Sequence, residues 1–228
     1  APEIAFGGQL NDTEIEVNNS AVLTLTNDNL NANGVILTLN DNAVHNNTGK
    51  TIKWGHLTAG KTSTLTINGN ASVSSLHFQL GNLGQGIINQ NGGTVDIAGD
   101  FRIGQDTNSA TASRYNLSAG TVTVGDEFDF GGTDAGADGG TYFNFTTVGS
   151  GLLTVETNSY DFAARIDSGE IRYQDAVYAS GSGIWNIDTG VSGQTTLSVV
   201  SEPPFGYAGW IAQYPGVGTA TNLTDNPD

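Results

Sequence analysis

Residues 88–131 contain the same pattern twice. The first copy reads INQNGGTVDIAGDFRIG (88–104) and the second reads YNLSAGTVTVGDEFDFG (115–131). The matching residues are separated by 27 positions without exception, and they are Asn89/Asn116, Gly93/Gly120, Thr94/Thr121, Val95/Val122, Phe101/Phe128 and Gly104/Gly131. A constant period of this length is typical of repeat proteins, in which each unit buries its apolar face against its neighbours.

Each copy predicts short strands joined by tight corners. Polar and apolar residues alternate over 94–97 and 101–103, which is typical of strands with one buried face. Gly, Asp and Asn separate these strands and suit tight corners. With the segment around 88–91, each unit holds three strands, so we expect an all-β fold, a parallel β-helix (β-solenoid) of about seven coils. A β-sandwich or jelly roll with accidental internal similarity is the alternative interpretation.

The solenoid hypothesis predicts which side chains touch. Residues one period apart lie above one another at about 4.8 Å, so Phe101 would stack on Phe128. Asn89 would lie on Asn116, where the two amides can form a hydrogen-bonded ladder. The aromatic residues concentrated over 142–185 are expected to fill the core, with an exposed sugar-stacking platform as the alternative.

The composition changes at Ser201. We expect a solenoid domain over residues 1–200 and an aromatic, Pro/Gly-rich tail over residues 201–228, because Pro203 and Pro204 end any strand ladder. The first coil lacks an evident polar cap. The tail is therefore expected either to cap its own last coil or to dock head-to-tail onto the first coil of another copy. The residues expected in this interface are Phe205, Tyr207, Trp210, Ile211, Tyr214, Ile4 and Phe6.

The charge balance excludes one class of partner. The 228 residues include 23 acidic and 7 basic side chains, a formal net charge of −16, whereas nucleic acid binding requires clustered Lys and Arg. No run approaches the roughly 18 apolar residues of a membrane span, so no span is expected. The chain lacks Cys and Met and begins APEIAF. We interpret this start as the product of signal-peptide cleavage and predict a secreted or cell-surface protein.

The Gly-rich segment 131–140 contains an incomplete calcium-loop pattern. Asp134 and Asp138 occupy positions one and five, but Gly136 and Phe145 stand at positions three and twelve, where the pattern needs oxygen ligands. A plain Gly-rich loop is the simpler interpretation and a calcium site the alternative; no other cofactor is expected. Metal-ligand spacing is also missing among the three histidines, which are His45, His56 and His77.

The quoted repeats resemble a group of exported proteins. NGGTVDIAGDFRIG and YNLSAGTVTVGDEFDFG look like the β-strand repeats in secreted proteins of Verrucomicrobia and Planctomycetes, many of them sorted by a PEP-CTERM-type signal or related to autotransporter passenger repeats. The tail FGYAGWIAQYPGVGTATNLTDNPD is similar to the segment that precedes a calcium-binding run and a sorting helix in those proteins, and this sequence stops before both. The resemblance implies an exported β-helical protein of mostly unknown function.

Three functions compete. An exported structural subunit that self-assembles into an extracellular fibre or surface matrix fits the uncapped coil and the aromatic tail. A carbohydrate-binding or adhesive module, with surface polysaccharide as its partner, is the alternative. A polysaccharide-degrading enzyme would need two carboxylates about 5 to 9.5 Å apart, for which Asp100 and Glu127 are candidates with Arg102 nearby. Because acids this numerous form such pairs by chance, we expect no enzyme.

Overall fold

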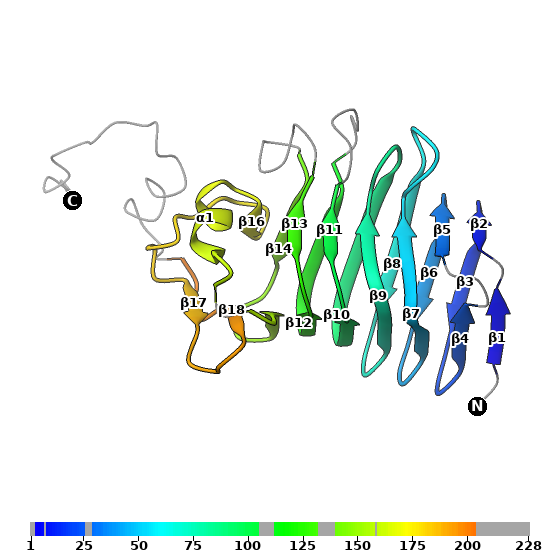
Figure 1. The fold of residues 1–228 in the computed structure, drawn as a ribbon, viewed down its shortest axis with the longest axis horizontal. Helices are drawn as coiled ribbons and strands as arrows, with labels where there is room; N and C mark the ends of the chain where they lie inside the picture. Colours follow the sequence, from blue (N-terminus) through cyan, green and yellow to red (C-terminus); the bar gives the residue numbers. More distant parts are fainter. Residues whose placement is uncertain are drawn as a thin grey trace, which may run out of the picture.

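The computed structural model of the chain describes residues 3–6, 8–25, 29–104, 112–131, 140–157 and 159–203. These residues form an elongated stack of coils that rises from the N-terminal strands at one end to a helix and a hairpin at the other (Figure 1). From residue 3 to residue 155 each strand pairs in parallel with the strand one coil away. The β-solenoid is therefore confirmed, and the antiparallel sandwich is excluded.

Three strands make each coil, as predicted, so the solenoid has three faces. The first face stacks β1 (Glu3–Phe6), β4 (Val22–Leu25), the first halves of β7 (Val44–Trp54) and β9 (Ser72–Leu80), the second halves of β10 (Gln85–Ile97) and β12 (Arg114–Val124), and β15 (Gly151–Val155). The second face stacks β2 (Gln9–Asn11), β5 (Asn29–Asn33), the second halves of β7 and β9, β11 (Phe101–Ile103) and β13 (Phe128–Phe130). The third face stacks β3 (Glu14–Val17), β6 (Ile36–Leu39), β8 (Thr62–Ile67), the first halves of β10 and β12, β14 (Tyr142–Phe145) and β16 (Ile171–Tyr173).

The number of coils is smaller than predicted. All three faces are present in six layers, from β1–β3 up to the layer that ends in β14, which corresponds to five turns between the first layer and the last. The prediction of about seven coils assumed that 27 residues per turn apply up to residue 200. After Val155 only β16 continues the parallel stack, on the third face, while the second face continues with the helix α1 in place of a strand, so no seventh coil is complete.

The predicted stacking is confirmed in detail. Val95 pairs with Val122, and the Phe101 ring lies on the Phe128 ring with their centroids 5.3 Å apart and 20° between their planes. All four side chains are buried. Aromatic rings that pack at this distance add to the free energy gained by burial alone, so this ring pair stabilises the core where the two copies of the repeat stack.

The paired glycines of the repeat lie at corners that have no room for a side chain. Gly93 and Gly120 both have positive φ angles, of 68° and 95°. A Cβ on Gly93 would lie 1.9 Å from the carbonyl oxygen of Ala71, and one on Gly120 would lie 2.3 Å from that of Gly93. Corners of successive coils therefore touch backbone to backbone, which explains why both copies of the pattern have Gly here.

The elements after β15 correct the sequence-based prediction. The alternating aromatic and polar residues over 160–166 predict a strand in the sequence. The structure corrects this prediction: Phe162–Asp167 form the helix α1, because Asp161 caps its start by accepting a hydrogen bond from the Ala164 N–H and because Phe162 and Ile166 bury one face. Alternation over 195–200 also predicts a strand, which exists as β18 (Thr195–Val199), but it runs antiparallel to β15 and to β17 (Trp185–Asp188). The aromatic residues of this region are core residues, as predicted, since Phe143, Phe145 and Tyr173 are fully buried.

Candidate functional site

The third face has a polar groove of about 480 Å³, which we call the amide groove. Side-chain amides and hydroxyl groups dominate its walls, together with one cation and one carboxylate. The residues that line it are Thr66, Asn89, Asn91, Arg114, Asn116, Ser118, Asn144, Thr146 and Asp175. These side chains offer many hydrogen-bond donors and acceptors but little charge.

Strand alternation places these side chains in rows. Residues at every second position of β10 and β12 face outward, because the residues between them, such as Ile88 and Tyr115, are buried. In β14 all four residues are buried, including Asn144 at the end of the groove. The parallel register then aligns Asn89 with Asn116 and Asn116 with Asn144. Each row in the groove therefore runs along the solenoid axis and contains one residue from each layer, with about 4.8 Å between neighbours.

The central row is a ladder of hydrogen-bonded amides, which confirms and extends the predicted Asn89–Asn116 contact. Asn116 Nδ2 donates to Asn89 Oδ1 at 2.9 Å, and Asn144 Nδ2 donates to Asn116 Oδ1 at 3.1 Å. An amide has two N–H donors and two acceptor lone pairs. Asn116 thus keeps one donor and one acceptor for a ligand after its ladder bonds are formed.

One end of the ladder is fixed by Asp175. Its Oδ1 accepts hydrogen bonds from Asn144 Nδ2 at 3.1 Å and from the Tyr142 hydroxyl at 2.8 Å, while its backbone N–H donates to Asn144 Oδ1 at 2.9 Å. Arg114 contributes a weaker contact to the same hydroxyl at 3.5 Å. Burial, ahead of the other causes, raises the pKa of Tyr142, so this hydroxyl stays protonated and donates.

A second amide ladder, which the sequence does not predict, lies beside the first. Asn40 donates to Asn18 at 2.8 Å, Asn68 to Asn40 at 2.8 Å, and Asn91 to Asn68 at 2.9 Å. The sequence separations in this ladder are 22, 28 and 23 residues. No constant period connects these residues, so the repeat gives no signal for them. Asn18, Asn40 and Asn68 each directly follow a strand, whereas Asn91 lies within β10.

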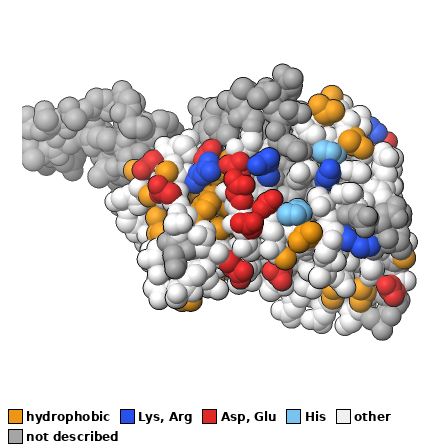
Figure 2. All heavy atoms as spheres, viewed as in Figure 1, with side chains coloured by type: hydrophobic (Ala, Val, Ile, Leu, Met, Phe, Trp, Pro, Cys, Tyr) orange, Lys and Arg blue, Asp and Glu red, His pale blue; other side chains and the backbone are white. Residues whose placement is uncertain are grey.

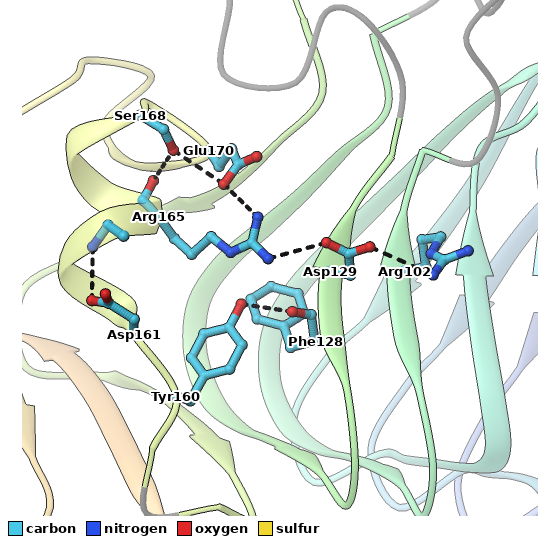
Figure 3. A network of polar contacts seen from close by, with 9 residues as sticks. Arg102, Phe128, Asp129, Tyr160, Asp161, Arg165, Ser168 and Glu170 are labelled. Carbon is cyan, nitrogen blue, oxygen red and sulfur yellow. Dashed lines mark hydrogen bonds and ion pairs between the residues drawn. The ribbon is translucent and has the colours of Figure 1, made fainter.

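A chain of alternating charges runs along the second face. Figure 2 shows acidic and basic side chains interleaved on one side of the molecule. Asp129 lies between Arg102, at 3.5 Å, and Arg165, at 3.1 Å, and Arg165 also bonds Glu170 at 3.0 Å (Figure 3). Tyr160 reaches the same region and donates to the carbonyl of Phe128 at 2.7 Å. These contacts dock α1 on the second face, at the level where a seventh strand would lie.

A smaller cleft of about 230 Å³ on the second face includes two residues of the enzymatic hypothesis, Asp100 and Arg102, beside Lys53 and His77. His77 Nδ1 accepts from the backbone N–H of Asp100 at 3.0 Å, which places the ring proton on Nε2. Asp100 Oδ2 lies 3.3 Å from the same nitrogen. The register places Glu127 one layer above Asp100, as expected, but Glu127 is exposed and does not line this cleft.

Several predicted site residues cannot be compared with the structure. Asp134 and Asp138 lie outside the described residues, as do Phe205, Tyr207, Trp210, Ile211 and Tyr214. Ile4 and Phe6 belong to β1, which pairs with β4, but their side chains are also outside the description. Within the described ranges, no group of three or more His, Asp or Glu side chains is arranged to hold a metal ion. The one helix there, α1, is too short and polar to cross a membrane.

Comparisons with protein-family models, with curated proteins and with solved structures find no match for this chain.

Proposed function

We propose that the chain is an exported carbohydrate-binding β-solenoid whose amide groove holds a neutral polysaccharide. The observation that supports this proposal is the central ladder, in which Asn89 and Asn116 present free amide donors and acceptors in register. A sugar hydroxyl both donates and accepts, so it can use both groups of one amide. Export is supported by the acidic composition and by the resemblance of the repeats to those of secreted proteins.

The proposed ligand is neutral for an electrostatic reason. A net charge of −16 repels anionic polymers, and among the described residues that line the groove Arg114 is the single cation. The groove also contains one carboxylate, Asp175, whose Oδ1 accepts two hydrogen bonds within the protein. Glycoside hydrolysis uses a pair of carboxyl groups, so we propose binding rather than cleavage.

The test is an array of neutral polysaccharides, with pectate and alginate as acidic comparisons. Asn116→Ala removes the middle of the groove ladder and should weaken binding to the best neutral glycan at least tenfold. Asn40→Ala is the matched control, because it also interrupts an amide ladder but lies outside the groove; it should bind like the unmodified chain. Absence of any neutral glycan ligand, or equal losses in the two variants, would refute the proposal.

The second candidate function is assembly through the first layer. Among the described residues, β1, β2 and β3 each pair on one side only, with β4, β5 and β6. Unpaired strand edges add strands from other chains. We propose a second copy of this chain as the occupant if the protein acts as a fibre or matrix subunit; electron microscopy that shows only isolated rods at high concentration would contradict it.

A further inference from the structure

Polar residues interrupt the apolar core at one place on the first face, between the third and fourth layers. On this face, inward-pointing register partners from successive layers form columns along the solenoid axis. One column is aliphatic except for His45 and consists of Leu23, His45, Val73, Val95, Val122 and Leu153. In the neighbouring column, Asn47 and Ser75 are followed by the aliphatic residues Ile97, Val124 and Val155. His45 and Asn47 are 1% exposed and Ser75 is 2% exposed.

These three side chains are neighbours inside the solenoid. His45 and Asn47 are two residues apart on β7 and are both buried, so they point to the same inner side. Asn47 and Ser75 are register partners on adjacent parallel strands, which lie about 4.8 Å apart. The three polar groups therefore converge on one region of the interior.

The polar atoms of this cluster lack partners in the protein. His45 Nε2, both polar atoms of the Asn47 amide and Ser75 Oγ are buried without a hydrogen bond. His45 Nδ1 faces the carbonyl oxygen of Leu23 at 3.4 Å, which places the ring proton on Nδ1 and leaves a lone pair on Nε2. Buried polar groups without a partner are rare in folded proteins, and four in one cluster indicate a bound molecule.

We propose that His45, Asn47 and Ser75 form an internal binding site for one water molecule. The water donates to His45 Nε2 and to Asn47 Oδ1, and it accepts from Asn47 Nδ2 and from the Ser75 hydroxyl. Buried waters make about two to four such bonds, so all four polar atoms can be satisfied. Ser75 is much smaller than the Ile97 that follows it in the column, and the difference provides room for the water.

The first test is a high-resolution crystal structure, together with water–amide nuclear Overhauser effects in solution. We expect an ordered water within hydrogen-bond distance of His45, Asn47 and Ser75. Ser63 is the internal control, since it is equally buried but donates to the Ala32 carbonyl and accepts from the Val35 N–H. A structure in which the three side chains bond one another directly, with no water among them, overturns the proposal.

A stability series provides the second test. Ser75→Val should expel the water, leave His45 and Asn47 without partners, and lower Tm by several degrees. Adding His45→Val and Asn47→Leu removes the unsatisfied groups, so the triple variant should melt above Ser75→Val. The same two changes should not rescue Ser63→Val. A triple variant no more stable than Ser75→Val contradicts the proposal.

Discussion

The three histidines show how strongly a residue's environment depends on its column in the solenoid. His45 is enclosed in the core, His56 is half-buried and bonds Asn82 at a corner, and His77 lines a cleft beside Asp100. In sequence none of the three has the spacing of a metal-ligand pair, which favours solvated loop or stacked surface positions for all of them. That expectation is wrong for His45, because strand alternation places it on the inner side of β7.

His45 should make the stability of the protein depend on pH. Burial, partly opposed by the contact with the Leu23 carbonyl, lowers its pKa from 6.5 to about 4. The unfolded chain therefore binds a proton before the folded chain does, and stability falls as the pH falls from about 6.5 towards 4. The full effect is on the order of 3 kcal/mol. Urea unfolding at pH 7, 6, 5 and 4.5 measures it.

The control for this measurement is His45→Val, the residue type found at the next position of the column, Val73. This variant keeps every carboxylate of the chain, so its stability should depend much less on pH between 6.5 and 4.5. An unchanged slope would show that carboxylates, rather than His45, cause the loss.

At the scale of secondary-structure elements, α1 takes the place of a strand. It begins at Phe162, just after β15, and Arg165 connects it to Asp129 of β13 and to Glu170 (Figure 3). Because the helix covers the second face where the parallel stack ends, it protects the edge of β13 from further pairing.

Removal of Arg165 should loosen this helix. Arg165→Ala removes the cation that Asp129 and Glu170 share, and the side chains of these two acids are only 26% and 12% exposed. We therefore expect the free energy of unfolding to fall by about 1–3 kcal/mol. Hydrogen exchange should become faster over residues 162–167. Arg102→Ala is the matched control, because Arg102 contacts the same Asp129 from inside the stack. Equal protection of the helix in both variants would contradict its proposed role.

Sequence reasoning found the elements whose spacing is constant and missed those whose spacing varies. The Asn89–Asn116 ladder was predictable because both residues belong to the 27-residue repeat. Asn144, one layer further, is 28 residues from Asn116, and its strand no longer resembles the repeat. The groove as a whole could not be derived, since Asp175 joins it through a turn with a positive φ of 61° rather than through a strand. Likewise, the alternation of Tyr160 and Phe162 is that of a strand, and only the hydrogen bond from the Ala164 N–H to Asp161 distinguishes the segment as the start of a helix.

At the scale of the whole molecule, the two ends of the solenoid differ. The first layer presents three strand edges without partners among the described residues, while α1 and the antiparallel β18 cover the other end. Exposed acidic residues, among them Asp12, Glu14 and Glu16, lie on or beside the open edges. Like charges at a strand edge oppose pairing with another copy.

Association of copies should therefore depend on salt. The Debye length falls from about 30 Å at 0.01 M to about 3 Å at 1 M ionic strength, so sedimentation velocity should detect larger species only at high salt. Glu14→Gln with Glu16→Gln should shift this onset to lower salt. The control is Asp126→Asn with Glu127→Gln, which removes the same number of charges at an exposed corner far from the edge. A chain that stays monomeric in every condition would rule out assembly through this edge.

The ladders stay aligned although neighbouring asparagines in them are between 22 and 28 residues apart in the sequence. Alignment is thus set within each strand, and the corners take up every difference in length. A peptide spliced into a corner such as Gly149, whose surroundings are open, should leave the rod intact. One residue added inside β10 would turn the core side chains beyond it to the solvent. The solenoid can therefore carry inserted peptides at its corners, whereas its strands tolerate no change of length.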